Sequence, residues 1–93
     1  MYTILQVIGM SKKEKLINRL ISRPSDFEFS ELITLLGYFD YTVAKSGKTS
    51  GSKVTFEDGE GDYLRIHKPH PRKILKHYQI DDIITSLKER GKI

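Results

Sequence analysis

Two short stretches of alternating apolar and polar residues, joined by a turn of acids and glycines, most constrain the fold of this 93-residue chain. The stretches are Ser52–Phe56 and Tyr63–His67, and the turn between them is Glu57–Asp62. Alternation over five residues is typical of a strand with one buried and one open face, and glycines favour a tight turn between two such strands. The sequence therefore predicts an antiparallel hairpin.

The alternation also assigns the side chains of this hairpin to two faces. Four apolar side chains are expected to point inward: Val54, Phe56, Leu64 and Ile66. The open face then carries two cations, a histidine, a hydroxyl and a tyrosine ring: Lys53, Arg65, His67, Thr55 and Tyr63. His70 lies just past the end, in the basic segment Lys68–Arg72. Since RNA-binding surfaces combine cations with aromatic rings, we predict that this surface binds RNA.

The distribution of charge supports this prediction more than the net charge of +4 does. Residues 41–56 contain three lysines and residues 63–78 contain five Lys/Arg and all three histidines, whereas neither window contains an acid. Four of the twelve acidic residues lie in the turn between the strands. A surface that follows a phosphate backbone needs this kind of segregation, although a solvated basic face would also show it.

The rest of the chain predicts three helices and one more strand. The first helix, Ser11–Arg23, begins with a Ser11/Glu14 capping box, and the second begins at a Ser30 cap and ends at Gly37. Tyr38–Ser46 is rich in aromatic and β-branched residues and is predicted to be a strand. Four apolar residues of the last helix, predicted at Gln79–Arg90, recur with helical spacing: Ile80, Ile83, Ile84 and Leu87. The predicted order, α-α-β-β-β-α, defines the α+β class.

Composition excludes several kinds of protein. The chain has no cysteine, which excludes disulfides, thiol catalysis and the usual zinc ligand sets. It has no apolar run of roughly 18 residues, so we expect no membrane span and a cytoplasmic location. Lys48, in the loop before the hairpin, would attract phosphate, but its surroundings lack the order of a nucleotide-binding phosphate loop. We expect residues 10–93 to form one domain, with Met10 as the natural start and residues 1–9 as an upstream extension.

Several motifs together resemble the HicA toxins, a family of small bacterial proteins. The matching residues are Gly37-Tyr38 at a helix end, Gly51-Ser52 before a strand, Phe56 on that strand, Lys68-Pro69-His70-Pro71 after the last strand, and the terminal Gly91-Lys92-Ile93. The resemblance covers about Ser11 to Ile93. It implies a double-stranded-RNA-binding-domain-like fold, in which helices pack on one face of a three-stranded antiparallel sheet.

The resemblance also implies a function. HicA-like proteins are toxins of type II toxin–antitoxin pairs that cleave mRNA, and a HicB-like antitoxin silences them. Members of the family carry a catalytic histidine directly after Gly-Ser, where this chain has Lys53. Free lysine has a pKa near 10.4, against about 6.5 for histidine, so lysine is a poor proton acceptor at neutral pH.

RNA can be cleaved without a metal or other cofactor when one group removes the 2′-hydroxyl proton and another protonates the leaving oxygen. We assign these roles to His70, which matches a second family histidine, and to His67 as its partner. Phosphate-binding and base-binding roles are assigned to the surrounding residues: Lys53, Ser52, Arg65, Lys68, Arg72, Lys48 and Tyr63. A metal at His67-x-x-His70 would lack a third ligand.

Three functions remain open at this point. The first is an endoribonuclease toxin that acts on single-stranded mRNA and binds a HicB-like antitoxin. The second is an RNA-binding module or inactive toxin relative, which the replacement by Lys53 favours. The third is a domain that binds only protein. Loss of cleavage with retained RNA affinity in a His70 variant would distinguish the first from the others.

Overall fold

The computed structural model describes residues 11–44 and 53–93. Within these ranges the elements follow the predicted order: α2 (Lys12–Ile21), α3 (Phe29–Gly37), β1 (Thr42–Val43), β2 (Lys53–Glu57), β3 (Tyr63–His67) and α4 (His77–Glu89). The protein is therefore of the α+β class, as predicted. The predicted extension at residues 1–9 lies outside the described residues.

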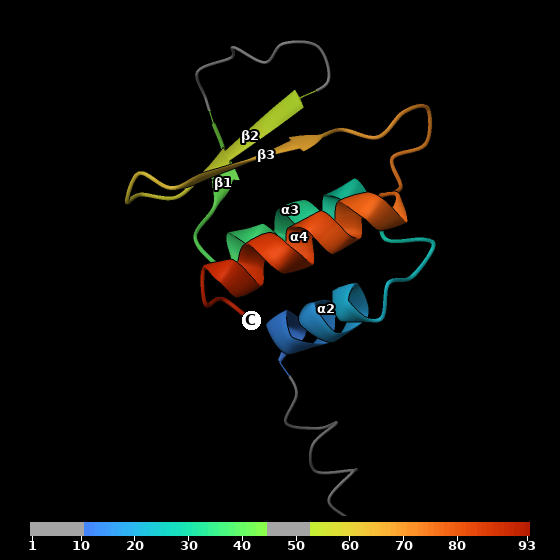
Figure 1. Cartoon of the computed structure of the whole chain (residues 1–93), viewed down its shortest axis with the longest axis horizontal. Coiled ribbons are helices and arrows are strands. Elements are labelled where there is room, and N and C mark those ends of the chain that lie inside the picture. Colours follow the sequence, from blue (N-terminus) through green and yellow to red (C-terminus); the bar gives the residue numbers. More distant parts are fainter. Residues whose placement is uncertain (1–10, 45–52) are drawn as a thin grey trace, which may run out of the picture.

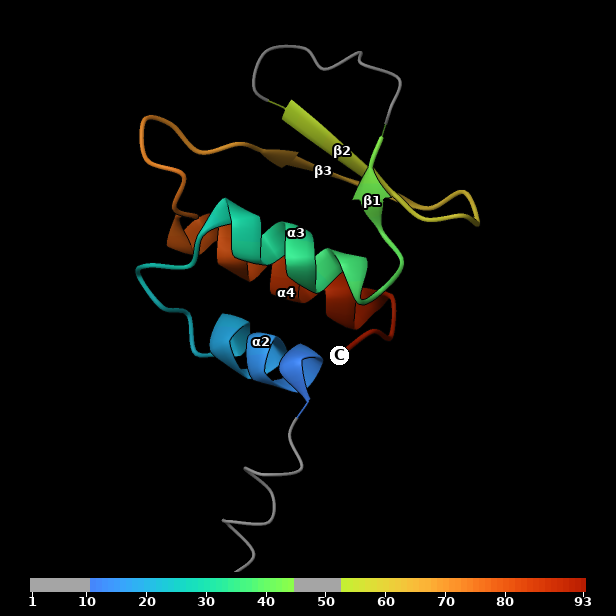
Figure 2. The same ribbon diagram turned by 180° about the vertical axis from the view of Figure 1, so that it is seen from behind.

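The three strands form one antiparallel sheet in the order β1-β2-β3. Helices α3 and α4 lie against one face of this sheet, and α2 packs on them from the side away from the sheet (Figures 1 and 2). Within residues 11–44 and 53–93 the helices thus lie on one side of the sheet, in two layers. No helix of these described ranges covers the opposite face of the hairpin.

The hairpin has the predicted faces, with β2 displaced by one residue from the predicted Ser52–Phe56. Phe56 lies opposite Leu64, and Val54 lies opposite Ile66. Phe56, Leu64 and Ile66 are buried in the core, and Val54 packs against its edge. The phenyl rings of Phe56 and Phe29 lie 6.0 Å apart, which joins β2 to α3. Burial of each such side chain contributes about 1.5–3 kcal/mol.

The ends of α2 and α4 follow the predicted caps. The Ser11 Oγ accepts the Glu14 N–H at 3.1 Å, and α2 ends at Ile21, two residues before the predicted end. Helix α4 begins at His77, two residues before the predicted Gln79, and Gly91 has the left-handed φ of +67° that ends a helix. The predicted apolar stripe of α4 faces the core, with Ile80, Ile83 and Leu87 buried.

The strand predicted at Tyr38–Ser46 is wrong over its first half. Tyr38–Asp40 continue the last turn of α3, and the described strand is only Thr42–Val43. Asp40 takes a left-handed φ of +69°, its N–H bonds the Gly37 carbonyl, and the Tyr41 N–H bonds the Leu36 carbonyl at 3.0 Å. This hydrogen-bond pattern is a Schellman ending, which outweighs the strand preference of the aromatic residues.

The predicted Ser30 cap of α3 is also wrong. Helix α3 begins at Phe29, with Glu28 as its N-cap residue. The Glu31 carboxylate accepts the Glu28 N–H at 2.8 Å, and the Ser30 Oγ donates to Glu28 at 3.4 Å. The Glu31 carboxylate therefore bonds the N–H of the N-cap residue, and Ser30, which was predicted to be the cap, lies inside the first turn of the helix.

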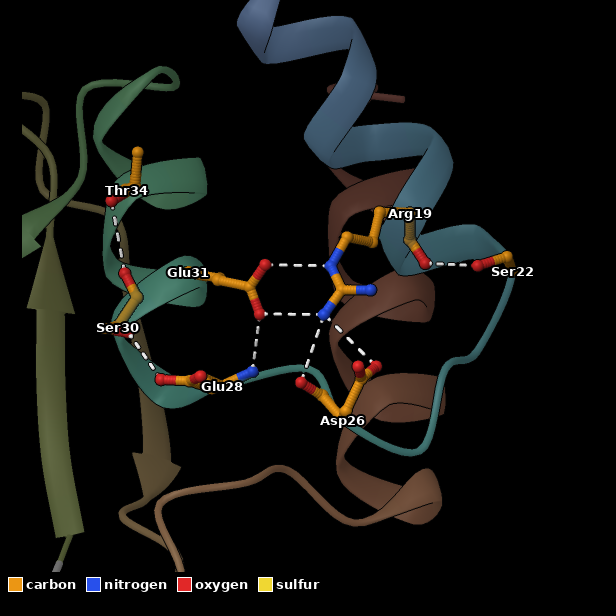
Figure 3. Close-up of polar contacts among 7 residues, drawn as sticks. All are labelled: Arg19, Ser22, Asp26, Glu28, Ser30, Glu31 and Thr34. Carbon is orange, nitrogen blue, oxygen red and sulfur yellow. Dashed lines mark hydrogen bonds and ion pairs between the residues drawn. The ribbon is translucent and has the colours of Figure 1, made fainter.

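A cluster of charged residues connects α2 to α3 (Figure 3). The Arg19 guanidinium donates to both Glu31 oxygens, at 2.8 and 3.1 Å, and to the Asp26 carboxylate at 3.2 Å. The Arg19 hydrogen bond lowers the pKa of Glu31, and the same bond raises the pKa of Arg19. Because Glu31 also caps α3, one carboxylate stabilises the helix start and its contact with α2.

A second ion pair holds the acidic turn of the hairpin to the end of α4. The Arg90 Nε donates to the Asp62 Oδ2 at 2.7 Å, and the Tyr41 hydroxyl donates to the same oxygen. The hydrogen bonds from Arg90 and then from Tyr41 lower the pKa of Asp62 to about 2. Burial, followed by the bond to Asp62, raises the pKa of Tyr41 to about 12.

This contact predicts a specific loss of stability in acid. A carboxyl whose pKa is depressed on folding stabilises the folded state above its ordinary pKa, and this stabilisation disappears as the pH falls towards the folded value. We expect Asp62→Asn to lower the free energy of unfolding at pH 6 but to have little effect near pH 2. Urea titrations across this range measure the difference. Arg90→Gln should reduce the fall in the free energy of unfolding between pH 6 and pH 2. If the free energy of unfolding of Asp62→Asn and of wild type changed with pH in the same way, the assignment would be contradicted.

Candidate functional site

The open face of the hairpin brings together the polar residues predicted there. Lys53 lies directly opposite His67, and Thr55 lies directly opposite Arg65. Side chains of directly opposed residues in an antiparallel pair share a face, with Cβ atoms about 5 Å apart. Arg65 and His67 are exposed, and Lys53 and Thr55 are half-buried. The predicted grouping of a lysine and a histidine on one face is therefore confirmed.

Tyr63 and Arg65 form a pair further along the same face of β3. Tyr63 is 53% exposed, and the Arg65 guanidinium lies 5.2 Å from the centre of its ring. This cation–π contact holds both planar groups at the surface, where either offers a stacking surface. The strand thus presents a planar platform at one end and His67 at the other.

The basic segment after β3 is fixed at both ends. Pro69 is buried near its start, and the Lys73 carbonyl accepts the Phe29 N–H at 2.8 Å near its end. The Leu75 N–H then donates to the Phe27 carbonyl at 2.8 Å. Sequence analysis did not predict this pairing with the start of α3. It leaves His70 exposed on a segment whose flanks are anchored.

The two predicted histidines line one open hollow of about 300 Å³ where β3, the basic segment and α4 meet. We call this the His-lined hollow. Its lining residues are His67, Lys68, Pro69, His70, Lys76, Tyr78 and Gln79. No carboxylate is among these described lining residues. The hollow combines two imidazoles with two ammonium groups, a set that fits proton transfer beside an anion.

Gln79 fixes the geometry of this hollow. It is only 7% exposed, and its side-chain amide donates to the His67 carbonyl at 2.8 Å. Its Oε1 accepts the Lys76 N–H at 3.0 Å at the start of α4. One amide therefore joins the end of β3 to the first turn of α4, and this sets the spacing between His67 and Lys76.

The other predicted residues have different outcomes. Lys68 is half-buried and lines the His-lined hollow, whereas Arg72 is exposed and lies outside it. Ser52 and Lys48 lie outside the described residues. The last helix was predicted to begin at Gln79, so Lys76 and Tyr78, which lie at the observed start of α4, were not assigned to it. A glutamine three residues after a lysine is not the Ser/Thr-x-x-Glu/Gln capping-box pattern, so no local signal marked the earlier start.

Two further findings bear on the class of the site. In residues 11–44 and 53–93, no group of three or more His, Cys, Asp or Glu side chains is arranged to hold a metal ion. No helix in this part of the chain is long and apolar enough to cross a membrane.

Comparison with known proteins gives no match of any kind. The chain matches no protein-family model, no curated protein and no solved structure.

The role of Gln79 can be tested by substitution. We expect Gln79→Ala to destabilise the protein by about 1–3 kcal/mol, because it removes a buried amide and leaves the His67 carbonyl and the Lys76 N–H without this partner. Thr85→Ala, on an exposed position of the same helix, should change stability by less than about 0.5 kcal/mol. Urea denaturation measures both. In NMR spectra the His67 ring signals should move in Gln79→Ala and stay in place in Thr85→Ala. Equal stability of the two variants would contradict the role.

Proposed function

We propose that this protein binds single-stranded RNA and cleaves it without a metal, through the imidazoles of His67 and His70. The observation that carries the proposal is the pairing of Lys53 with His67 across β2 and β3. The HicA-like proteins that the chain resembles carry a histidine at the position of Lys53. Here the neighbouring strand supplies a histidine, because His67 of β3 lies directly opposite Lys53 and on the same face.

The cleavage step uses groups that line the His-lined hollow. One imidazole takes the proton of the ribose 2′-hydroxyl, and the 2′-oxygen attacks the adjacent phosphorus. The bond from phosphorus to the 5′-oxygen breaks as the other imidazole, in its protonated form, gives a proton to that oxygen. The products are a 2′,3′-cyclic phosphate and a 5′-hydroxyl. Lys53, Lys68 and Lys76 offset the negative charge that develops on the phosphate.

We further propose that the protein acts as the toxin of a type II toxin–antitoxin pair in the cytoplasm. Its resemblance to HicA toxins supports this, together with the α+β architecture and the basic open face. The partner would be a HicB-like antitoxin. A neighbouring reading frame that encodes a small acidic protein is the expected genetic context.

The requirement for His70 is the first test of cleavage. Purified protein is incubated with end-labelled single-stranded RNA in excess EDTA. We expect fragments that end in 2′,3′-cyclic phosphate, and a rate that falls by about 10²–10⁴-fold in His70→Ala. His77→Ala is the matched control, since His77 is exposed on α4 outside the lining of the His-lined hollow. Equal loss in both variants, or cleavage that EDTA abolishes, would contradict the mechanism.

The cross-strand relation of Lys53 and His67 allows a sharper test. His67→Lys alone should lower the cleavage rate by roughly 10²-fold, since it removes one imidazole. The double variant Lys53→His/His67→Lys exchanges the two side chains on one face and should recover most of that loss. A swapped variant as inactive as His67→Lys would show that the histidine must stand on β3.

Non-catalytic RNA binding is the second candidate function, and the Tyr63–Arg65 platform favours it. In that case wild type retards RNA on a gel without cutting it. Its affinity then falls steeply with salt, as expected of phosphate contacts, and is lowered by Arg65→Ala more than by His70→Ala.

A further inference from the structure

A second hollow lies on the other side of the His70 segment. It encloses about 340 Å³ between the basic segment and the loop that joins α2 to α3. Ser25 of that loop lines it together with Arg72, and Leu75 and Pro71 contribute apolar surface. We call it the Ser25 hollow. Sequence analysis did not predict it, because Ser25 lies 45 residues before His70 in the chain.

The two hollows share a wall. Pro69, His70 and Lys76 line both of them. The two hollows therefore adjoin, with His70 and Lys76 at their common boundary. A chain that passes from one hollow to the other would place one unit in each and the link between them beside His70 and Lys76.

The chemistry of the Ser25 hollow matches one nucleotide. Its volume is at the low end of the roughly 300–1,000 Å³ typical of small-ligand sites. Proline and aliphatic side chains offer apolar surface for the face of a base, and the Ser25 hydroxyl can hydrogen-bond a polar edge. Arg72 and Lys76 supply positive charge for a phosphate. No carboxylate is among the described residues that line the hollow.

We propose that the Ser25 hollow binds the nucleotide next to the phosphodiester held at His70, and that Lys76 binds the phosphate between the two hollows. This inference rests on the proposed function, because it takes single-stranded RNA as the ligand. It adds a binding subsite for a second nucleotide beside the phosphate that Lys76 contacts. It also predicts a preference for single strands, because a base within a duplex is stacked and paired and cannot enter a separate hollow.

Uncleavable ligands test the subsite independently of catalysis. The probes are 2′-O-methyl RNA oligomers of increasing length, since they lack the attacking hydroxyl, and fluorescence anisotropy measures their Kd. Ser25→Trp fills the hollow with a bulky side chain from the loop between α2 and α3, and Arg72→Ala removes one of the cations that line it. Thr85→Trp is the control for bulk, and Lys88→Ala is the control for charge. Both controls replace exposed residues of α4 outside the two hollows.

We expect wild-type affinity to rise with each added nucleotide until both hollows are filled. In Ser25→Trp the rise should stop one nucleotide earlier, and the longest oligomers should bind roughly tenfold more weakly, as for the loss of one stacked base. Lys76→Ala should weaken binding of every oligomer that spans two nucleotides. Ser25→Trp and wild type should bind a duplex with equal affinity. Circular dichroism confirms that each variant folds.

The outcomes separate the subsite from the proposed function. Single-stranded oligomers that bind wild type and Ser25→Trp equally at every length would overturn the subsite alone. Equal weakening by Ser25→Trp and Thr85→Trp would do the same. Wild type that binds none of the oligomers at low salt would overturn the proposed function and the subsite with it.

Discussion

The burial of one face of the β2–β3 hairpin against α3 and α4 determines most of this structure. Phe56 is completely buried, and its ring meets Phe29 at the start of α3. Because side chains alternate strictly along a strand, inward placement of Phe56, Leu64 and Ile66 forces Lys53, Arg65 and His67 outward. A shift of the register by one residue would bury the cations and expose the core. The free energy of the core therefore also maintains the arrangement of the polar face.

Sequence alone predicted those elements whose signals are local and consistent. The faces of the hairpin, the Ser11 cap and the apolar stripe of α4 each follow from spacing within a few residues. The failures arose at the two ends of α3, where hydrogen bonds decide between two local possibilities. Tyr38 and Phe39 have high strand propensity, but the hydrogen bonds of the α3 ending keep them in a turn. Ser30 is a good cap residue, but α3 begins one residue before it. The Glu31 carboxylate accepts the Glu28 N–H there and is itself bonded by Arg19.

Part of the candidate site could likewise be predicted from the sequence. Alternation placed Lys53 and His67 on one face, and the order of residues placed His70 nearby. No sequence pattern indicates that residues 73–75 pair with residues 27–29, because those hydrogen bonds join backbone groups far apart in the chain. That pairing draws Ser25 and Arg72 to the same hollow and leaves His70 between two depressions. The roles of Lys76 and Gln79 depend on this closure of the fold, and so they became visible only in three dimensions.

Acidic and basic residues are also separated along the length of the hairpin. The acidic turn lies at one end of its two strands, and His67 with the basic segment lies at the other (Figure 1). Five residues of strand separate these ends by about 17 Å, so the pair acts as a molecular dipole on the surface. A polyanion such as the proposed RNA ligand would exert a torque on this dipole and turn its basic end forward before contact. That orientation would begin during diffusion, and it would weaken as salt shortens the Debye length.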